Sequence, residues 1–409
     1  MSTQLTNELD HLATFTDTPA PSVTRVVFTP NDLAARAYVK SLCKQAGLTI
    51  REDPVGNTFA RWVGQDPHLP AIATGSHIDA IPHAGMYDGT VGVLGGLEAI
   101  RALQRTGLRP KRSIELILFT SEEPTRFGIG CLGSRLLCGR LDAAAGSRLA
   151  DHTGQTLDEA RHAAGFSGLL ESVRLAPGHY EAFVELHIEQ GPLLEQDSLA
   201  VGVVTAIAAP ASLKIQIDGE GGHAGALLMP HRHDAFLAAA ELALAVEAAA
   251  KSTGVIDTVG TVGVCEVFPG AVNSIPSRTR LEVDIRDIDS ARRDGVIAAV
   301  RAASAEIANR RGVRIAIETV NADRPATCDP RIVQHLSYAC QQAAIPHRRL
   351  VSRAYHDSLF MAEIAPVAML FVRSRGGISH RPDEYSSPED IAAGVQVLAA
   401  TLGQLAGFR

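Results

Sequence analysis

Short apolar runs alternate with longer amphipathic segments along most of the chain. This alternation predicts an α/β architecture, in which strands and helices follow one another. The run from Ile114 to Phe119 is almost entirely apolar, so we expect a central strand that is covered on both faces. We expect helices near residues 31–46, 89–105, 234–250, 289–310, 329–343 and 388–405, and strands near 70–76, 113–120, 199–208, 211–218, 257–264, 279–286, 313–320 and 366–373.

The middle of the chain has a different pattern. Leu281, Val283 and Ile285 alternate with charged side chains, which predicts a strand with one apolar and one polar face. From residue 212 onwards the expected order is strand, helix, two strands, helix, strand, which fits a ferredoxin-like sheet with two helices on one face. We therefore expect a large α/β domain with a central mixed sheet at residues 1–211 and 327–409, and an inserted α+β domain at 212–326.

Composition narrows the class of protein. The chain has 409 residues, 38 Lys and Arg against 45 Asp and Glu, and a formal net charge of −7. Such a balance argues against nucleic acid or an anionic membrane as the main partner. The six cysteines include no C-x-x-C pair and the first residues show no leader pattern, so we expect a cytoplasmic protein with reduced thiols. The most apolar stretch, 235–250, contains two glutamates, and we do not expect it to span a membrane.

The first candidates for chemistry follow the strand expected at 70–76. His77 lies just past its carboxyl end, where ligands bind in open α/β sheets. Its imidazole can bind a metal ion, and Asp79 could accept a hydrogen bond from the second ring nitrogen and so fix the tautomer. Asp88 lies in a loop before a helix, and its carboxylate could bridge two metal ions. Taken singly, such residues are more often a surface histidine and a helix-capping aspartate.

Three further segments place polar residues in or after apolar strands. Glu122 and Glu123 directly follow an apolar strand, and adjacent carboxylates at such a place are costly unless a cation compensates them. One glutamate could bind a metal ion while the other serves as general base. His187 alternates with apolar neighbours as in a strand, and His380 follows another apolar strand. Taken singly, each of these residues is more often part of a solvated loop or a satisfied core histidine.

Together these candidates form a pattern that none of them has alone. There are three imidazoles and two carboxylates, most of them at or just past apolar strands. If Asp88 is shared, each of two metal ions has three protein ligands and keeps open positions for water and substrate, as in catalytic metal sites. The five expected ligands are His77, Asp88, Glu123, His187 and His380.

A second set of residues could contact a substrate. Arg286 lies on the polar face of a half-buried strand, a position that suits a bidentate grip on a carboxylate. His223 lies in the segment GGHAG, Asn273 follows a Pro-Gly turn, and His356 lies near the C-terminal end of the chain. Taken singly, each of them is more often structural.

Several motifs resemble those of one enzyme family. They are GSHIDAIPHAGMYDGTVGVLGGLEAI, TSEEPTRFG, CLGSR, ELHIEQGPLLE, GGHAG, PGAVNSIPSRTRLEVDIRDID and GGISHRPDEYSSPEDIAAGV, and they run from about residue 75 to 395. The sequence resembles the di-metal amidohydrolase and exopeptidase family, and within it the allantoate amidohydrolases, N-carbamoyl-L-amino-acid hydrolases and β-ureidopropionases. The resemblance implies a catalytic di-metal domain at 1–211 and 327–409, and a lid and dimerisation domain at 212–326.

The resemblance also implies a role for each residue. His77, Asp88 and His187 would bind one metal ion, and Asp88, Glu123 and His380 the other. Glu122 would be the catalytic base, and His187 is typical of the carbamoyl-cleaving branch, since peptidase members carry Asp at that position. The substrate-binding positions of that branch match Gln190, His223, Asn273, Arg286 and His356, with His223 also acting in catalysis from the partner subunit.

The sequence departs from the general carbamoylase pattern at several positions, and these departures indicate which substrate to expect. The segments at 226–232 and 353–358, together with GVVTAIAAPASLK and IDTVGTVG, resemble the ureidoglycolate amidohydrolases known from plants. We therefore expect hydrolysis of the ureido C–N bond of ureidoglycolate to glyoxylate, ammonia and carbon dioxide. Allantoate or an N-carbamoyl-L-amino acid is the alternative substrate. The resemblance favours two manganese ions per subunit, with zinc possible, and a homodimer.

Overall fold

The chain divides into two compact units. The computed structural model describes residues 2–407. Unit 1 extends to Thr205 and includes Cys328–Ser352 and the chain from His356 onwards, whereas unit 2 comprises Ala206–Thr327 and Arg353–Tyr355. Unit 2 therefore begins earlier than residue 212, and its first long strand begins at Ala209 and not near residue 211.

Every helix and strand expected from the sequence is present, with ends shifted by a few residues. The helices are α2 (Pro30–Gln45), α3 (Thr90–Gln104), α8 (Ala235–Ser252), α9 (Ser290–Arg311), α10 (Pro330–Gln342) and α12 (Pro388–Leu405). The strands are β4 (Ala71–Ser76), β6 (Ile114–Leu118), β8 (Val201–Ile207), β9 (Ala209–Asp218), β11 (Val259–Phe268), β13 (Arg278–Asp287), β14 (Arg314–Ala322) and β17 (Val367–Val372). Within residues 2–407, none of the helices combines the length and apolar character needed to cross a membrane.

The sequence analysis missed the remaining elements, and most of them are too short to show a period; the helix at Ser2–Ala13 has 12 residues and was missed although it is long enough. The missed helices are α1 (Ser2–Ala13), α4 (Leu132–Cys138), α5 (Ala143–Ser147), α6 (Leu157–Ala163), α7 (Leu193–Gln196) and α11 (Asp357–Met361), with 3₁₀ turns at Leu170–Val173, Met229–His231 and Arg375–Gly377. The other strands are β1 (Val23–Arg25), β2 (Thr49–Glu52), β3 (Thr58–Trp62), β5 (Ala80–Ala84), β7 (Tyr180–Ile188), β10 (Gly222–His223), β12 (Ser274–Ile275), β15 (Ala326–Thr327) and β16 (His347–Ser352).

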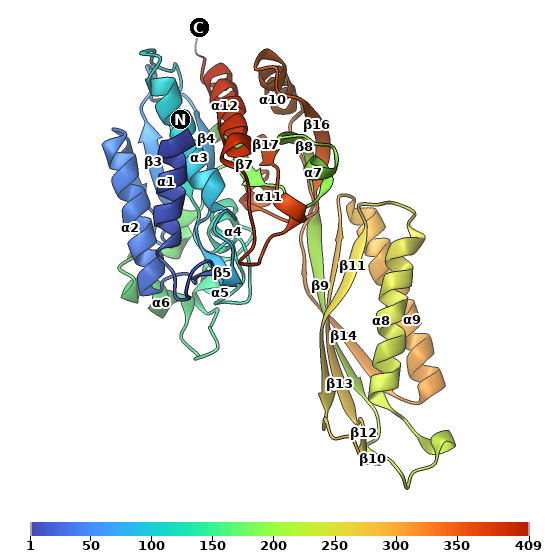
Figure 1. Cartoon of the computed structure of the whole chain (residues 1–409). Helices are drawn as coiled ribbons and strands as arrows, with labels where there is room; N and C mark the ends of the chain where they lie inside the picture. Colours follow the sequence, from blue (N-terminus) through green and yellow to red (C-terminus); the bar gives the residue numbers. More distant parts are fainter. Residues whose placement is uncertain (1, 408–409) are drawn as a thin grey trace. The chain divides into compact units, whose positions relative to one another are not determined.

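Unit 1 is built around a mixed sheet (Figure 1). From β8 onwards the strand order is β8-β17-β7-β4-β6-β3-β2, and β16 also pairs with β8. The neighbours β17, β7, β4 and β6 are parallel, whereas β8, β3 and β2 pair in an antiparallel manner. The expected α/β fold with a central mixed sheet is confirmed.

Helices pack on both faces of the parallel strands. α3 and α12 pack against each other and against β7, where Gly95 and Gly394 lie close to Leu186. Because side chains alternate along a strand, Glu185 and His187 point to the opposite face. α11 packs on β7 and β17 there and supplies hydrogen bonds to Glu185. The polar residues of β7 therefore share one face of the sheet.

Unit 2 has the ferredoxin-like plan expected from the sequence. Its antiparallel sheet has the order β11-β13-β9-β14, and α8 and α9 pack on it (Figure 1). Leu281, Val283 and Ile285 are buried among residues of β9, α8 and α9, whereas Glu282 and Asp284 alternate with them on the other face. The predicted alternation of this strand is therefore confirmed.

One position in β4 leaves no room for a side chain. Gly75 has a φ angle of 152°, and an added Cβ would lie 2.0 Å from the carbonyl oxygen of Ile117 in the neighbouring strand β6. This close approach is needed at the point where β4 delivers Ser76 and His77 to the edge of the sheet.

Gly75→Ala is therefore expected to lower the free energy of unfolding by about 3 kcal/mol or more. Overpacking typically costs about 1–3 kcal/mol, and here the obstructing atom belongs to the backbone of a central strand. Gly263→Ala in β11 is the matched control, because no heavy atom lies within 4 Å of its added Cβ; we expect it to change stability by only about 0.5 kcal/mol. Urea unfolding measures both variants, and equal stability would contradict the packing argument.

Candidate metal centre and active site

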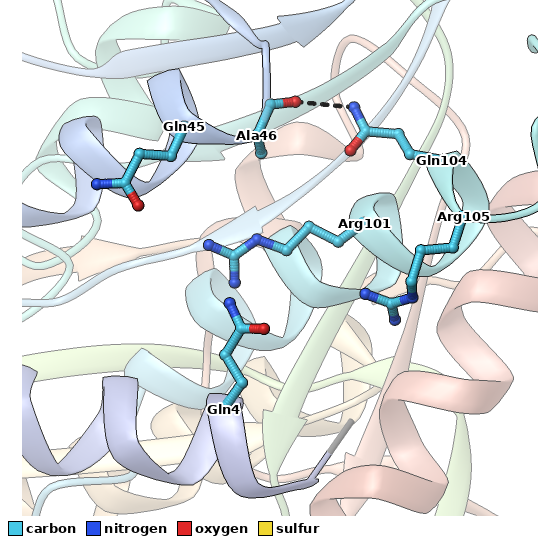
Figure 2. Close-up of a pocket in the computed structure, with 6 residues that line it drawn as sticks. All are labelled: Gln4, Gln45, Ala46, Arg101, Gln104 and Arg105. Carbon is cyan, nitrogen blue, oxygen red and sulfur yellow. Dashed lines mark hydrogen bonds between the residues drawn. The ribbon is translucent and has the colours of Figure 1, made fainter.

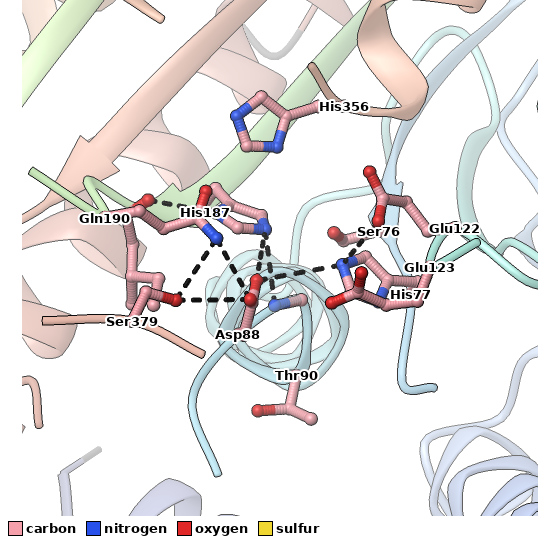
Figure 3. Close-up of polar contacts among 12 residues, drawn as sticks. Ser76, His77, Asp88, Thr90, Glu122, Glu123, His187, Gln190, His356 and Ser379 are labelled. Carbon is pink, nitrogen blue, oxygen red and sulfur yellow. Dashed lines mark hydrogen bonds and ion pairs between the residues drawn. The ribbon is translucent and has the colours of Figure 1, made fainter. Parts of the chain in front are cut away.

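The candidate ligands come from chain segments that meet at one edge of the unit 1 sheet (Figure 3). His77 follows β4, Glu122 and Glu123 follow β6, and His187 lies near the end of β7. Because β4, β6 and β7 are parallel, their carboxyl ends lie at the same edge. Asp88 precedes α3, and His380 follows β17, so these residues complete the group.

The structure brings the five expected ligands into two overlapping groups. His77, Asp88 and His187 form one, and Asp88, Glu123 and His380 form the other; within each group the possible ligand atoms lie within 4.8 Å of one another. Asp88 Oδ1 is 3.2 Å from His187 Nε2, whereas Asp88 Oδ2 is 3.1 Å from His380 Nε2. Each oxygen of Asp88 therefore faces a different group, as a bridging carboxylate requires.

Hydrogen bonds from the histidine rings orient the nitrogens that could bind a metal ion. Nδ1 of His77 lies 3.0 Å from the carbonyl oxygen of Asp79, and Nδ1 of His187 lies 2.9 Å from that of Ile188. A carbonyl accepts but does not donate, so Nδ1 carries a proton in both rings, and Nε2 is the atom that can bind a cation. Both Nε2 atoms face Asp88. The donor set thus fits a divalent cation.

The charges in this group compensate one another only incompletely. Burial, followed by the charges of Glu123 and Asp357, raises the pKa of Glu122 well above its usual range. Burial also favours a higher pKa for Asp88, but hydrogen bonds from His187 and His380 outweigh it and hold that pKa well below the usual range. Hydrogen bonds to Asp88 and Glu123 raise the pKa of His380 to about 10. Protons on imidazoles thus supply the positive charge that a bound cation would replace.

Asp79 has a different role from the expected one. Its carboxylate accepts the backbone N–H groups of Glu122 at 3.2 Å and Glu123 at 3.0 Å. The ring of His77 lies closer to the Asp79 carbonyl oxygen than to its carboxylate, which is 3.6 Å away. Asp79 therefore fixes the turn that carries the two glutamates, and it orients His77 through its backbone.

Two of the expected substrate-binding residues lie beside the candidate ligands. Gln190 Nε2 donates to Asp88 Oδ2 at 2.9 Å, and its buried Oε1 has no hydrogen-bond partner among residues 2–407. The ring of His356 is 4.4 Å from that of His187, and its Nε2 is 3.0 Å from the hydroxyl of Ser352 (Figure 3). Gln190 thus offers a free acceptor at the metal centre.

The other three expected substrate-binding residues belong to unit 2, at opposite ends of its sheet. His223 of β10 pairs with Ser274 of β12, next to Asn273. Arg286 lies near the far end of β13, where it forms an ion pair with Asp284 at 2.7 Å. The nine residues from 278 to 286 are eight steps of about 3.3 Å, so they span about 26 Å. Asn273 and Arg286 therefore lie far apart within one chain.

Comparison with known proteins agrees with this site. The sequence profile of peptidase family M20/M25/M40 matches residues 73–404. The chain belongs to peptidase family M20/M25/M40. It is 56% identical to a ureidoglycolate hydrolase of Arabidopsis thaliana over 98% of this chain and 86% of that relative. It is 40% identical to an N-carbamoyl-L-amino acid amidohydrolase of Geobacillus stearothermophilus, over 95% of this chain and 94% of the relative.

Solved structures show the same fold as this M20 chain. A crystal structure of AtUAH in complex with glyoxylate matches 99% of this chain and 97% of AtUAH, with a TM-score of 0.91 and 54% sequence identity. A second structure of AtUAH contains (S)-hydroxyglycine and matches equally well.

Sequence reasoning missed several polar residues around the M20 site. Glu185 accepts hydrogen bonds from the hydroxyl groups of Ser76 at 2.8 Å and Ser358 at 2.6 Å, and so joins β7 to β4 and α11. The thiol of Cys131 lies 3.4 Å from Glu122 Oε1. Glu384 lies four residues after His380 and was also missed. Closeness to the ligand motifs was the only signal in the sequence for Glu185 and Glu384.

A separate hollow of about 490 Å³ lies on unit 1, and none of the candidate metal ligands lines it (Figure 2). Two arginines contribute to it, but Arg101 is paired with Glu8 and Arg105 with Glu98, each at 2.8 Å. The charges of the arginines are thus already compensated. The lining residues are Gln4, Gln45, Ala46, Arg101, Gln104 and Arg105.

A divalent cation is expected to stabilise the M20 protein against heat. Binding at 100 times the Kd contributes about 2.7 kcal/mol if the unfolded chain does not bind. Calorimetry of chelator-treated protein with and without Mn²⁺ measures the shift in Tm. His380→Ala, which removes a half-exposed candidate ligand of the second group, should reduce the shift. An identical Tm with and without Mn²⁺ and Zn²⁺ would contradict a metal centre.

Proposed function

We propose that the chain hydrolyses the ureido C–N bond of ureidoglycolate and yields glyoxylate, ammonia and carbon dioxide. The observation that carries the proposal is the likeness to AtUAH over 99% of this chain. The AtUAH structures contain glyoxylate and (S)-hydroxyglycine, which are the two-carbon fragments expected after loss of the carbamoyl group. The reaction consumes water, and both the carbamate and the hydroxyglycine that it forms decompose to release ammonia.

The proposed cofactor is a pair of divalent cations. His77, Asp88 and His187 would hold one of them, and Asp88, Glu123 and His380 the other. Mixed imidazole and carboxylate ligands suit manganese or zinc. Manganese is favoured by the resemblance to ureidoglycolate-cleaving enzymes. When bound, such a pair polarises the ureido carbonyl and lowers the pKa of a nearby water molecule.

Glu122 is the proposed general base. It is buried, its Oε2 lies 3.7 Å from His77 Nε2, and its backbone is fixed by Asp79. Its carboxylate takes a proton from the attacking water and then returns the proton to the leaving nitrogen. Positive charge bound beside it would keep the carboxylate ionised, against the effect of burial.

The remaining residues would orient the substrate. Gln190 offers its free Oε1 to the ureido N–H groups, and His356 flanks the same site. Arg286 would hold the substrate carboxylate through two parallel hydrogen bonds. His223 would stabilise the oxyanion, with Asn273 beside it.

We also propose that the protein is a cytoplasmic homodimer joined through unit 2, which would serve as lid and dimerisation domain. Arg286 and the pair His223 and Asn273 lie too far apart in one chain to contact one small substrate. Two subunits related by a two-fold axis can each supply one end of the sheet. Analytical ultracentrifugation tests the dimer, and a monomer at all concentrations would contradict it.

A rival substrate has support from a specific observation. The 40% identity to an N-carbamoyl-L-amino acid amidohydrolase favours a longer carbamoyl substrate that uses the same centre, as allantoate also would. Side-by-side turnover by the Mn²⁺-loaded protein decides between them. We expect the highest kcat/KM for ureidoglycolate, and a higher value for allantoate or an N-carbamoyl-L-amino acid would contradict the proposal.

Glu122→Gln is expected to abolish turnover while metal binding is retained. The amide has nearly the same shape as the carboxylate but cannot accept the proton of water. Loss of general-base catalysis lowers rates by about 10²–10⁴-fold. Stopped assays of kcat, with metal content measured on the same sample, give the result.

The neighbouring residue Glu123 supplies the control for the Glu122→Gln variant. Glu123→Gln should lose metal ions as well as activity, because Glu123 belongs to the second ligand group. A near-normal rate for Glu122→Gln with full metal content would remove Glu122 from the proposed role.

A further inference from the structure

One buried carboxylate joins two segments that carry candidate metal ligands. Glu384 is 5% exposed. Its Oε1 accepts hydrogen bonds from the backbone N–H groups of Tyr87 at 2.8 Å and Asp88 at 3.1 Å. Its Oε2 accepts a hydrogen bond from the hydroxyl of Ser379 at 2.8 Å. Asp88 and Glu384 are 296 residues apart, so this contact exists only in the folded protein.

Ser379 extends the connection to the carboxylate of Asp88. Its hydroxyl lies 3.3 Å from Asp88 Oδ2, and Gln190 Nε2 lies 3.2 Å from the same hydroxyl. Nε2 of the next residue, His380, is 3.1 Å from Asp88 Oδ2. Glu384 therefore holds the backbone of Asp88 directly, and by accepting the one hydroxyl proton of Ser379 it fixes the segment that carries His380.

The turn that carries Asp88 is packed closely on two sides. An added Cβ on Gly85 would lie 2.3 Å from the Cβ of Glu384. An added Cβ on Gly89 would lie 2.5 Å from His77 Nε2. These glycines let the turn lie between Glu384 and His77, so contacts with both residues define where Asp88 is placed.

We propose that Glu384 is a positioning residue of the metal centre, because it holds the shared carboxylate of Asp88 and the adjoining segment Ser379–His380 in one arrangement. The inference rests on the two-cation centre proposed above, but not on the identity of the substrate. A bridging carboxylate must present one oxygen to each cation, so a displaced Asp88 weakens both positions. Residues that orient metal ligands change metal affinity by about 10–100-fold when they are substituted.

Titration calorimetry of the chelator-treated full chain with Mn²⁺ alone tests the proposal. Glu384→Ala removes the acceptor of three hydrogen bonds, and we expect the Kd for Mn²⁺ to rise by about 10–100-fold. Glu384→Gln keeps one oxygen that can accept both backbone N–H groups, so it should recover most of the affinity. Asp383→Ala is the matched control in the same loop, since Asp383 is exposed and its carboxylate pairs with Arg381; its Kd should equal that of the wild type.

The Tm of each metal-free protein separates positioning from general stability. A lower Tm for Glu384→Ala with an unchanged Kd for Mn²⁺ would overturn the proposal. If Glu384→Ala does not fold, Glu384→Asp is titrated instead, because its shorter side chain cannot reach all three donors; an unchanged Kd would again overturn it. A wild type that binds Mn²⁺ but does not cleave ureidoglycolate contradicts the proposed substrate alone, whereas a wild type that binds no Mn²⁺ contradicts this inference as well.

Discussion

The site in unit 1 is governed by the cost of burying several carboxylates at one place. Asp88, Glu122 and Glu123 are each less than a tenth exposed. Buried like charges repel one another, and an unpaired buried charge is unfavourable by several kcal/mol. Imidazole protons compensate part of this charge, as the raised pKa of His380 shows. Two cations would compensate it more fully, and this requirement explains why so many acidic groups meet where no arginine or lysine pairs with them among the described salt bridges.

Two regularities of the sheet bring these acidic groups and the histidines together at one place. Parallel strands end at one edge, so the residues after β4 and β6 meet although they are far apart in the sequence. Alternation along β7 places Glu185 and His187 on the face opposite α3, while Leu186 packs against that helix. One strand thus contributes both to the apolar core and to the polar site. The backbone N–H groups of the loops are then held by carboxylates such as Asp79 and Glu384.

How far the sequence predicts the structure depends on the range of the interaction. The apolar run at Ile114–Phe119 and the alternation at 281–286 are local patterns, and both strands are present. His77, Glu122 and Glu123 were recognisable because polar residues follow an apolar strand directly. Asp79 shows the limit, since sequence spacing cannot distinguish a contact through the carboxylate from one through the carbonyl.

Residues whose partners are distant in sequence could not be predicted. Glu384 contacts Tyr87 and Asp88, which are 297 and 296 residues away, and nothing in its own neighbourhood marks it as different from Asp383. The role of Glu185 could not be predicted for the same reason, because its partners Ser76 and Ser358 come from two other segments. Such contacts are set by strand order, which the hydrophobic pattern does not specify.

The strand register of unit 2 places the two ends of β13 far apart. Arg278 pairs with Asp218 at one end of the sheet, and Arg286 pairs with Pro210 at the other. A substrate as small as ureidoglycolate cannot extend along the whole of β13. If His223 and Arg286 both contact it, they therefore come from different chains, and a two-fold interface would use the same surface of each subunit. Each subunit would then complete its partner's site as well as its own, which makes assembly a condition for catalysis.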